Sequence, residues 1–114
     1  MADPRARLRA LCLALPEAYE EQTWGTPTFR VRKKIFVTVG DHLDRPSASM
    51  KADRLECAAL LAQGDPFFYP PYVGSKGWIG VDLSSGALDW DELGELVVES
   101  YRLIAPRRLS AGLG

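Results

Sequence analysis

Long apolar runs are absent from this sequence of 114 residues. Its uninterrupted apolar stretches span only a few residues, whereas a membrane-spanning helix needs about 20. The N-terminal segment, MADPRARLRALCLALPEAY, has too short an apolar stretch to span a membrane and lacks the small-residue cleavage site of a secretory signal. We therefore expect a soluble cytoplasmic protein without membrane contacts.

Cysteine and histidine are also scarce, with two cysteines, Cys12 and Cys57, and one histidine, His42. Both cysteines fall on the apolar side of expected helices, so we expect reduced packing residues rather than a disulfide. Neither is near His42 in the sequence, so a thiol nucleophile lacks a visible activating base. Asp41, His42 and Asp44 form a single set of loop ligands without a second cluster, so we predict no metal site.

The sequence also has few residue patterns typical of acid-base catalysis or of phosphate binding. Glu20 and Glu21 are adjacent and therefore point to opposite faces of a strand, which rules out a paired catalytic role. The GSKG stretch, residues 74–77, has the glycines and lysine of a phosphate-binding loop but precedes a strand instead of opening a helix. We predict no catalytic residue and no cofactor, and expect a binding domain rather than an enzyme.

The residues that are present describe an ordinary globular domain, with 46% apolar and 25% charged side chains. This length suits one domain, which we place at residues 1–106, followed by a flexible tail over residues 107–114. The formal net charge is -1, but residues 1–34 contain seven basic and four acidic side chains, while residues 82–99 contain six acidic and no basic ones. We therefore expect surfaces of opposite sign.

The first half of the sequence predicts one helix and then a run of strands. Asp3 can cap a helix that starts at Pro4 and stops at Pro16. The apolar positions of this helix recur at helical spacing: Leu8, Leu11, Cys12 and Leu15. Alternating β-branched and aromatic residues then predict antiparallel strands over residues 19–24, 27–31 and 34–40, and a fourth strand, 47–52, follows the polar loop 40–46.

The second half predicts two more helices around one more strand. Asp53 caps a helix that ends at Gly64, and Asp89 caps a final helix that ends before Pro106. The buried face of the final helix is predicted to be Leu93, Leu96, Val97, Ser100, Tyr101 and Ile104. Between them lie the irregular loop 63–77 and a fifth strand, 78–83. The order α-β-β-β-β-α-β-α predicts an α+β fold with an antiparallel sheet of about five strands and helices packed on one face.

Three stretches carry a resemblance to a known family: LPEAYEEQTWGTPTFRVRKKIF, PPYVGSKGWIGVDL and DWDELGELVVESYRLIAPRRL. They resemble the MmcQ/YjbR family of small bacterial proteins over nearly the whole chain and in the same element order. The resemblance implies an α+β fold like that of secretion chaperones and frataxin, described as a double-wing, DNA-binding-like domain. It implies no established activity, and the DNA-binding label rests on likeness of fold.

A cluster of cations, Arg30, Arg32, Lys33 and Lys34, falls on the hairpin between the second and third strands. If Phe29, Val31, Ile35 and Val37 point inward, then Arg30, Lys34 and Phe36 point outward, and Arg32 with Lys33 forms the turn. A protruding basic hairpin can contact phosphates as a wing does. Lys51 and Lys76 could extend this patch, with Trp78 or Tyr72 stacking on a base.

The cations also admit a simpler interpretation. Lysine and arginine are common at exposed hairpin tips, where they protect edge strands from pairing with other chains. The isoelectric point near 5.8 favours this interpretation, because dedicated duplex-binding domains are usually strongly basic. The sequence leaves both open, with DNA as the candidate partner of the first.

A second functional hypothesis concerns the aromatic, proline-rich loop over residues 65–74. Its aromatic residues, which could form an apolar surface for a protein or peptide partner, are Phe67, Phe68, Tyr69 and Tyr72. The alternative is that the loop covers the sheet as part of the core. The oligomeric state is open, and we expect a monomer.

Overall fold

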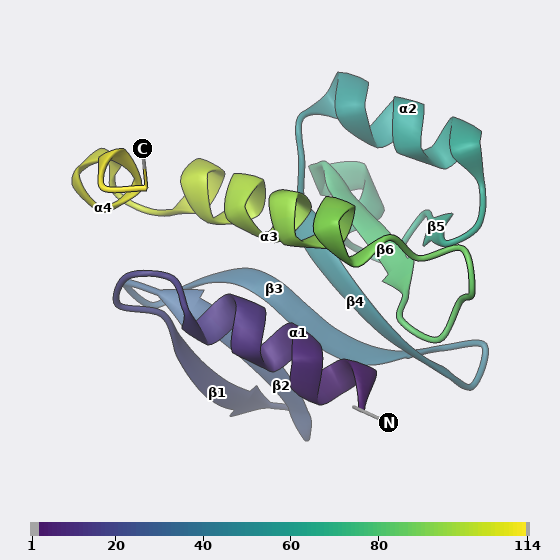
Figure 1. The fold of residues 1–114 in the computed structure, drawn as a ribbon, viewed down its shortest axis with the longest axis horizontal. Helices are drawn as coiled ribbons and strands as arrows, with labels where there is room; N and C mark the ends of the chain where they lie inside the picture. Colours follow the sequence, from purple (N-terminus) through teal and green to yellow (C-terminus); the bar gives the residue numbers. More distant parts are fainter. Residues whose placement is uncertain (1–2, 114) are drawn as a thin grey trace.

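The computed structural model describes residues 3–113, which form an antiparallel sheet with helices packed on it (Figure 1). The strand order is β1-β2-β3-β4-β6-β5, so the predicted α+β class is confirmed and the sheet has six strands. The elements in chain order are α1 (Pro4–Leu13), β1 (Tyr19–Thr23), β2 (Thr26–Val31), β3 (Lys34–His42), β4 (Arg45–Lys51), α2 (Arg54–Gln63), β5 (Phe67–Phe68), η1 (Gly74–Lys76), β6 (Trp78–Asp82), α3 (Trp90–Ile104) and α4 (Arg107–Ala111).

The three longer helices begin where their caps predict. The carboxylate of Asp3 accepts a hydrogen bond from the Arg5 amide, and that of Asp53 accepts one from the Leu55 amide. The carboxylate of Asp89 accepts hydrogen bonds from the amides of Asp91 and Glu92, the second and third residues of α3. Each cap satisfies amide groups that have no partner inside the helix. The helix starts are therefore a local property of the sequence.

Tight turns join the first four strands. The turns β2–β3, at Arg32 and Lys33, and β3–β4, at Leu43 and Asp44, both have positive φ at their two central residues. This geometry matches the twist of the flanking strands but favours glycine or asparagine over long side chains. The predicted loop over residues 40–46 is therefore wrong, since β3 and β4 run up to a two-residue turn. The residues at this end of the hairpin are mostly polar, so they lack the alternation of apolar and polar residues that predicts a strand.

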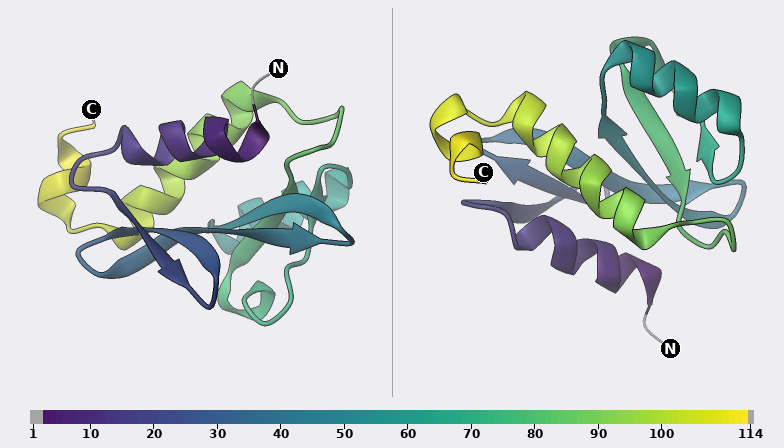
Figure 2. Two further views of the ribbon diagram at one scale, coloured as in Figure 1. Left: turned by 90° about the horizontal axis from the view of Figure 1, so that it is seen from below. Right: turned by 45° about the horizontal axis from the view of Figure 1, so that its top comes forward.

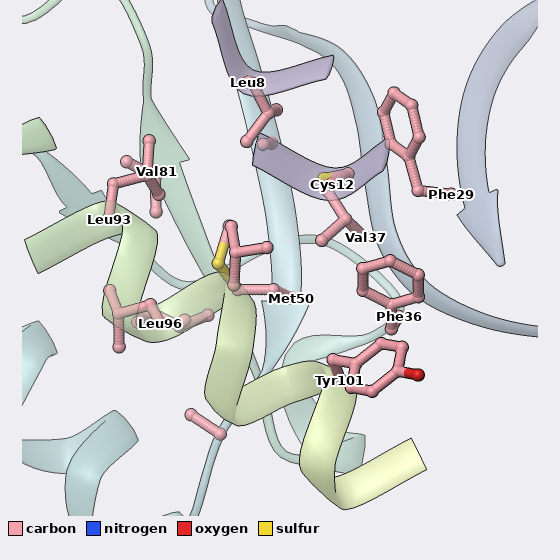
Figure 3. Packing of buried hydrophobic residues seen from close by; sticks show 14 of the residues in the cluster. Leu8, Cys12, Phe29, Phe36, Val37, Met50, Val81, Leu93, Leu96 and Tyr101 are labelled. Atoms are coloured by element: carbon pink, nitrogen blue, oxygen red, sulfur yellow. The ribbon is translucent and has the colours of Figure 1, made fainter. Parts of the chain in front are cut away.

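A bulge in β3 overturns the predicted orientation of Phe36. Phe29 pairs with Val37, whereas the next residue, Arg30, pairs with Ile35, so Phe36 is the extra residue. Its side chain is fully buried, and its ring packs edge-on against Tyr101 of α3 with centroids 5.4 Å apart (Figure 3). Strict alternation fails here because the bulge turns two successive side chains, Phe36 and Val37, inward.

The core lies between the sheet and the helices (Figure 3). Helix α3 crosses β3 and β4, and α1 packs beside it near β1, as the views in Figure 2 show. The predicted buried face of α3 is confirmed except at Ile104, which is half-buried. Helix α2 covers β5 and β6 and adds Cys57 and Leu60 to the same core.

Two segments expected to be irregular are ordered. The loop 63–77 contains β5, which pairs with β6, and the short helix η1. The tail 107–114 was expected to be flexible, yet residues 107–111 form α4, and Leu109 and Leu113 pack against the core. Helix α4 forms after Pro106, which occupies its N-cap position. Within residues 3–113 no helix is both long and apolar enough to cross a membrane.

Candidate nucleic-acid interface

Two of the four hairpin cations are held by carboxylates. The Nε atom of Arg30 lies 3.1 Å from a Glu21 oxygen, and its guanidinium also donates to the Thr23 and Thr28 hydroxyls. Only 17% of its side chain is exposed. Arg30 therefore braces β1 against β2 and has few donors left for a ligand.

Arg32 forms a bidentate pair with Glu17. Its Nε and one terminal nitrogen donate to the two Glu17 oxygens at 2.9 and 3.1 Å. The hydrogen bond from Arg32 lowers the pKa of Glu17, and the nearby charge of Arg108 lowers it further. The pair anchors the β2–β3 turn to the segment after α1, so the Arg32 charge is largely neutralised where it stands.

The four lysines of the predicted patch are different. Within residues 3–113, the side chains of Lys33, Lys34, Lys51 and Lys76 have no carboxylate partner. Lys33, Lys34 and Lys76 are exposed, and Lys51 is half-buried. Their ammonium groups remain available to an anion.

Strand pairing places these lysines at one end of the sheet. Val37 pairs with Met50, so β3 begins where β4 ends, and Lys51 pairs directly with Trp78 at the start of β6. Lys51 and Lys76 line one groove of about 390 Å³ together with Arg54 and one carboxylate, Asp53. The structure thus brings Lys51 together with Lys76 and Trp78, and it places Lys33 and Lys34 on the neighbouring hairpin tip.

Other arginines at this end were missed by the sequence reasoning. Helix α4, which carries Arg107 and Arg108, lies beside the β2–β3 turn in both Figure 1 and Figure 2. Arg54 joins through the first turn of α2. The helix-forming run after Pro106 was the available signal for α4. We call the surface formed by Lys33, Lys34, Lys51, Arg54, Lys76, Arg107 and Arg108 the basic end.

Acidic residues gather at the opposite end of the strands. Asp44 lies in the β3–β4 turn, Asp82 ends β6, and the first turn of α3 contains Asp91 and Glu92. Some are paired, such as Asp82, which accepts a hydrogen bond from Arg45 at 3.3 Å. The division of charge along the strands is partial, because Arg5 and Arg45 pair with carboxylates at this end and Asp53 lines the lysine groove at the other.

The aromatic loop divides between core and surface. Phe67 is 6% exposed and belongs to the core, so it is not available to a partner. Phe68 stacks on His42 with ring centroids 3.8 Å apart, and Tyr69 packs over Gly74 while remaining 58% exposed. Tyr72 is 94% exposed.

A groove of about 410 Å³ lies where this loop meets the sheet. Figure 2 (left) shows the loop with η1 on one side of the sheet and α1 and α3 on the other. The groove is bounded by the loop and by the His42–Phe68 stack, and its floor comes from β3 and β4: Thr38, Gly40, Ser47 and Ser49. We call it the sheet-face groove.

The remaining sequence candidates are Asp41, His42 and the two cysteines. Within residues 3–113, no group of three or more His, Cys, Asp or Glu side chains is placed to hold a metal ion. Asp41 pairs with Arg5 at 2.7 Å, and His42 is engaged by Phe68. Both cysteines are free and buried, and burial raises the pKa of Cys12 to about 12.

Comparison with known proteins identifies the family. The YjbR family model matches residues 13–103, which include the β2–β3 hairpin, the sheet-face groove and most of α3. The chain belongs to the YjbR family. The resemblance seen in the sequence is therefore confirmed.

A solved YjbR-like structure has the same fold. The crystal structure of Deinococcus radiodurans protein DR2400, with a DUF419 domain, matches with a TM-score of 0.76 at 25% sequence identity. The match covers 90% of this chain and 81% of that one. No curated protein matches this chain. Family membership and this structural match support the fold. Any function of the basic end has to be argued from its side chains.

Proposed function

We propose that this protein is a non-enzymatic nucleic-acid-binding domain that contacts phosphates through its basic end. The observation that carries the proposal is the set of four lysines without carboxylate partners within residues 3–113: Lys51, which pairs with Trp78, Lys76 in the same groove as Lys51, and Lys33 and Lys34 on the neighbouring hairpin tip. A nucleic-acid backbone presents several negative charges to one protein surface, so it can engage several such lysines at once.

The free lysines favour this function because they can bind a phosphate without first losing an ion pair. Arg32 would have to leave Glu17 before it could contact a phosphate, which lowers its net contribution. Four of the seven cations of the basic end are lysines, whose contacts with phosphates carry charge but little sequence information. We expect binding that depends on salt and tolerates sequence.

Fluorescence anisotropy with short labelled DNA tests the proposal. If the four lysines neutralise four phosphates, the logarithm of the association constant falls with the logarithm of salt concentration with a slope of about -3.5 on duplex DNA. The double variant Lys33→Gln/Lys76→Gln should weaken binding and reduce the slope by about 1.8.

A matched control removes two cations from the other end. The double variant Arg5→Gln/Arg45→Gln has the same net charge as Lys33→Gln/Lys76→Gln, but its lost side chains belong to the pairs with Asp41 and Asp82. It should keep the wild-type slope. If neither single-stranded nor duplex DNA binds at tens of micromolar protein in low salt, the proposal is wrong.

A further inference from the structure

We infer that the nucleic acid is single-stranded, and that its bases cross the open face of the sheet from Trp78 into the sheet-face groove. This inference rests on the proposed function and names its ligand class. It adds a base-binding surface to the phosphate-binding basic end, through residues that no ion pair or core contact requires.

Register places Lys51 of the basic end on the same face as the groove. Residues two apart on a strand share a face, so Lys51, Ser49 and Ser47 lie in line along β4. Trp78 pairs with Lys51, and Gly80 pairs with Ser49. The opposite face carries the core residues of the same strands and is covered by the helices.

The side chains in the middle of this face are small, so they protrude little from the sheet. One row across the strands pairs Thr38 with Ser49, Ser49 with Gly80, and Gly80 with Phe68. A Cβ atom at Gly80 would collide with the Phe68 ring, so glycine is required for that ring to lie flat against β6. The Phe68 ring therefore covers Gly80, and the part of the row that lines the groove is Thr38 and Ser49, over which a planar group can lie.

The hydroxyl groups of the floor have no partner within the described part of the chain. Thr38, Ser47 and Ser49 make no hydrogen bond through their side chains there, although all three line the groove. A hydroxyl can donate or accept, so it suits any base edge. Base edges carry hydrogen-bond donors and acceptors that these hydroxyls can pair with. The unpaired hydroxyls therefore favour a polar ligand over an apolar peptide segment.

Aromatic rings border the floor. The rings of His42 and Phe68 stack at an interplanar angle of 7° on one side, and Tyr72 stands almost fully exposed at the loop. In single-strand binding, bases stack on exposed rings while lysines follow the backbone. Here the groove supplies the rings, with Asp41 in its lining, and the lysines lie toward the Lys51 end of the same face. Tyr72 holds φ at 67° despite its bulk, so the loop keeps this ring outside the core at a backbone cost.

The dimensions suit a short single strand. Lys51 and Arg45, which pairs with His42, are six residues apart, so this face runs about 20 Å along β4. That length matches a run of about four nucleotides, the lower end of site sizes for single-strand-binding domains. Paired bases in a duplex are hidden from such a floor.

Anisotropy with two probes tests the inference: a labelled oligothymidylate of about twelve nucleotides and a duplex of the same length, in about 50 mM salt. Tyr72→Gly removes the ring and relieves the positive φ, so it should fold normally, which its melting temperature checks. We expect wild type to prefer the single strand, and Tyr72→Gly to bind it roughly tenfold more weakly with duplex binding unchanged.

Controls separate this inference from the proposed function. Tyr72→Phe keeps the ring and should bind as wild type, and Leu55→Ala, which trims an exposed apolar residue on α2, should do the same. Lys33→Gln/Lys76→Gln should weaken both probes. If duplex binds as well as the single strand and Tyr72→Gly changes nothing, the inference is wrong while the proposed function stands. If neither probe binds, or only a peptide occupies the groove, both are wrong.

Discussion

The Ser100 hydroxyl donates a 2.6 Å hydrogen bond to the backbone carbonyl of Phe36. It also accepts one from the Lys51 amide at 2.9 Å. β3 and β4 separate at this point, because their ladder ends at Val37 and Met50. A side chain from α3 therefore replaces a rung of the sheet and fixes the backbone next to Lys51.

The Ser100→Ala variant tests this link. Removing the hydroxyl leaves the Phe36 carbonyl and the Lys51 amide without a partner, so the free energy of unfolding should fall by about 2 kcal/mol. Urea titration measures the change. Ser110→Ala is the control, because the Ser110 hydroxyl donates only to an exposed carbonyl of its own helix and should cost less than about 0.5 kcal/mol. Equal effects of the two variants would contradict the role given to Ser100.

A substitution in the β2–β3 turn should change stability and DNA binding in opposite directions. Lys33 has φ of 68°, a conformation that costs a non-glycine residue about 1 kcal/mol. Lys33→Gly should therefore raise the melting temperature by about 4 °C while weakening DNA binding. Lys34→Gly removes the same charge from a strand without positive φ, so it should lower the melting temperature. A lower melting temperature for Lys33→Gly would contradict the strained turn.

Glu17 makes the hairpin anchor sensitive to acid. Because its hydrogen bond to Arg32 lowers the pKa of Glu17 below the usual 4.5, the pair stabilises the fold at pH above that value. This stability is lost as pH falls through the lowered pKa. Wild type should therefore melt slightly above Glu17→Gln near neutral pH, and the difference should vanish in acid. A difference that persists or grows at low pH would contradict the sign.

The same variant should strengthen DNA binding. Glu17→Gln removes the carboxylate that neutralises Arg32, which frees a guanidinium at the basic end. The salt slope should then become steeper by up to about 0.9. Anisotropy at several salt concentrations measures it. An unchanged slope would place the hairpin outside the binding surface.

Neither cysteine should react in the folded protein. Burial raises the pKa of the Cys12 thiol to about 12, and burial followed by the charges of Glu56 and Asp53 raises that of Cys57. Few thiolates form at about pH 8, and those that form are covered. A chromogenic disulfide reagent should label neither thiol in the native state and both in denaturant. Rapid native labelling would contradict the packing around these residues.

Much of the fold could be predicted because its signals are local. The caps Asp3, Asp53 and Asp89, the stops at Gly64 and Pro106, and the apolar spacing of α3 each act within a few residues. Less could be predicted for the candidate site. The neutralisation of Arg30 and Arg32 depends on carboxylates that lie nine and fifteen positions earlier in the chain and reach them only through folding.

The amino-acid sequence by itself determined the order of the main elements, the starts of the three longer helices and the presence of a basic hairpin, because propensity, capping and periodicity need only neighbouring residues. Tertiary structure decided the rest. The bulge turned Phe36 inward, strand pairing brought Lys51 to Trp78, and docking of α3 and α4 set which cations share an end. These outcomes depend on packing between distant segments, where the burial of a whole face outweighs the preference of any single residue.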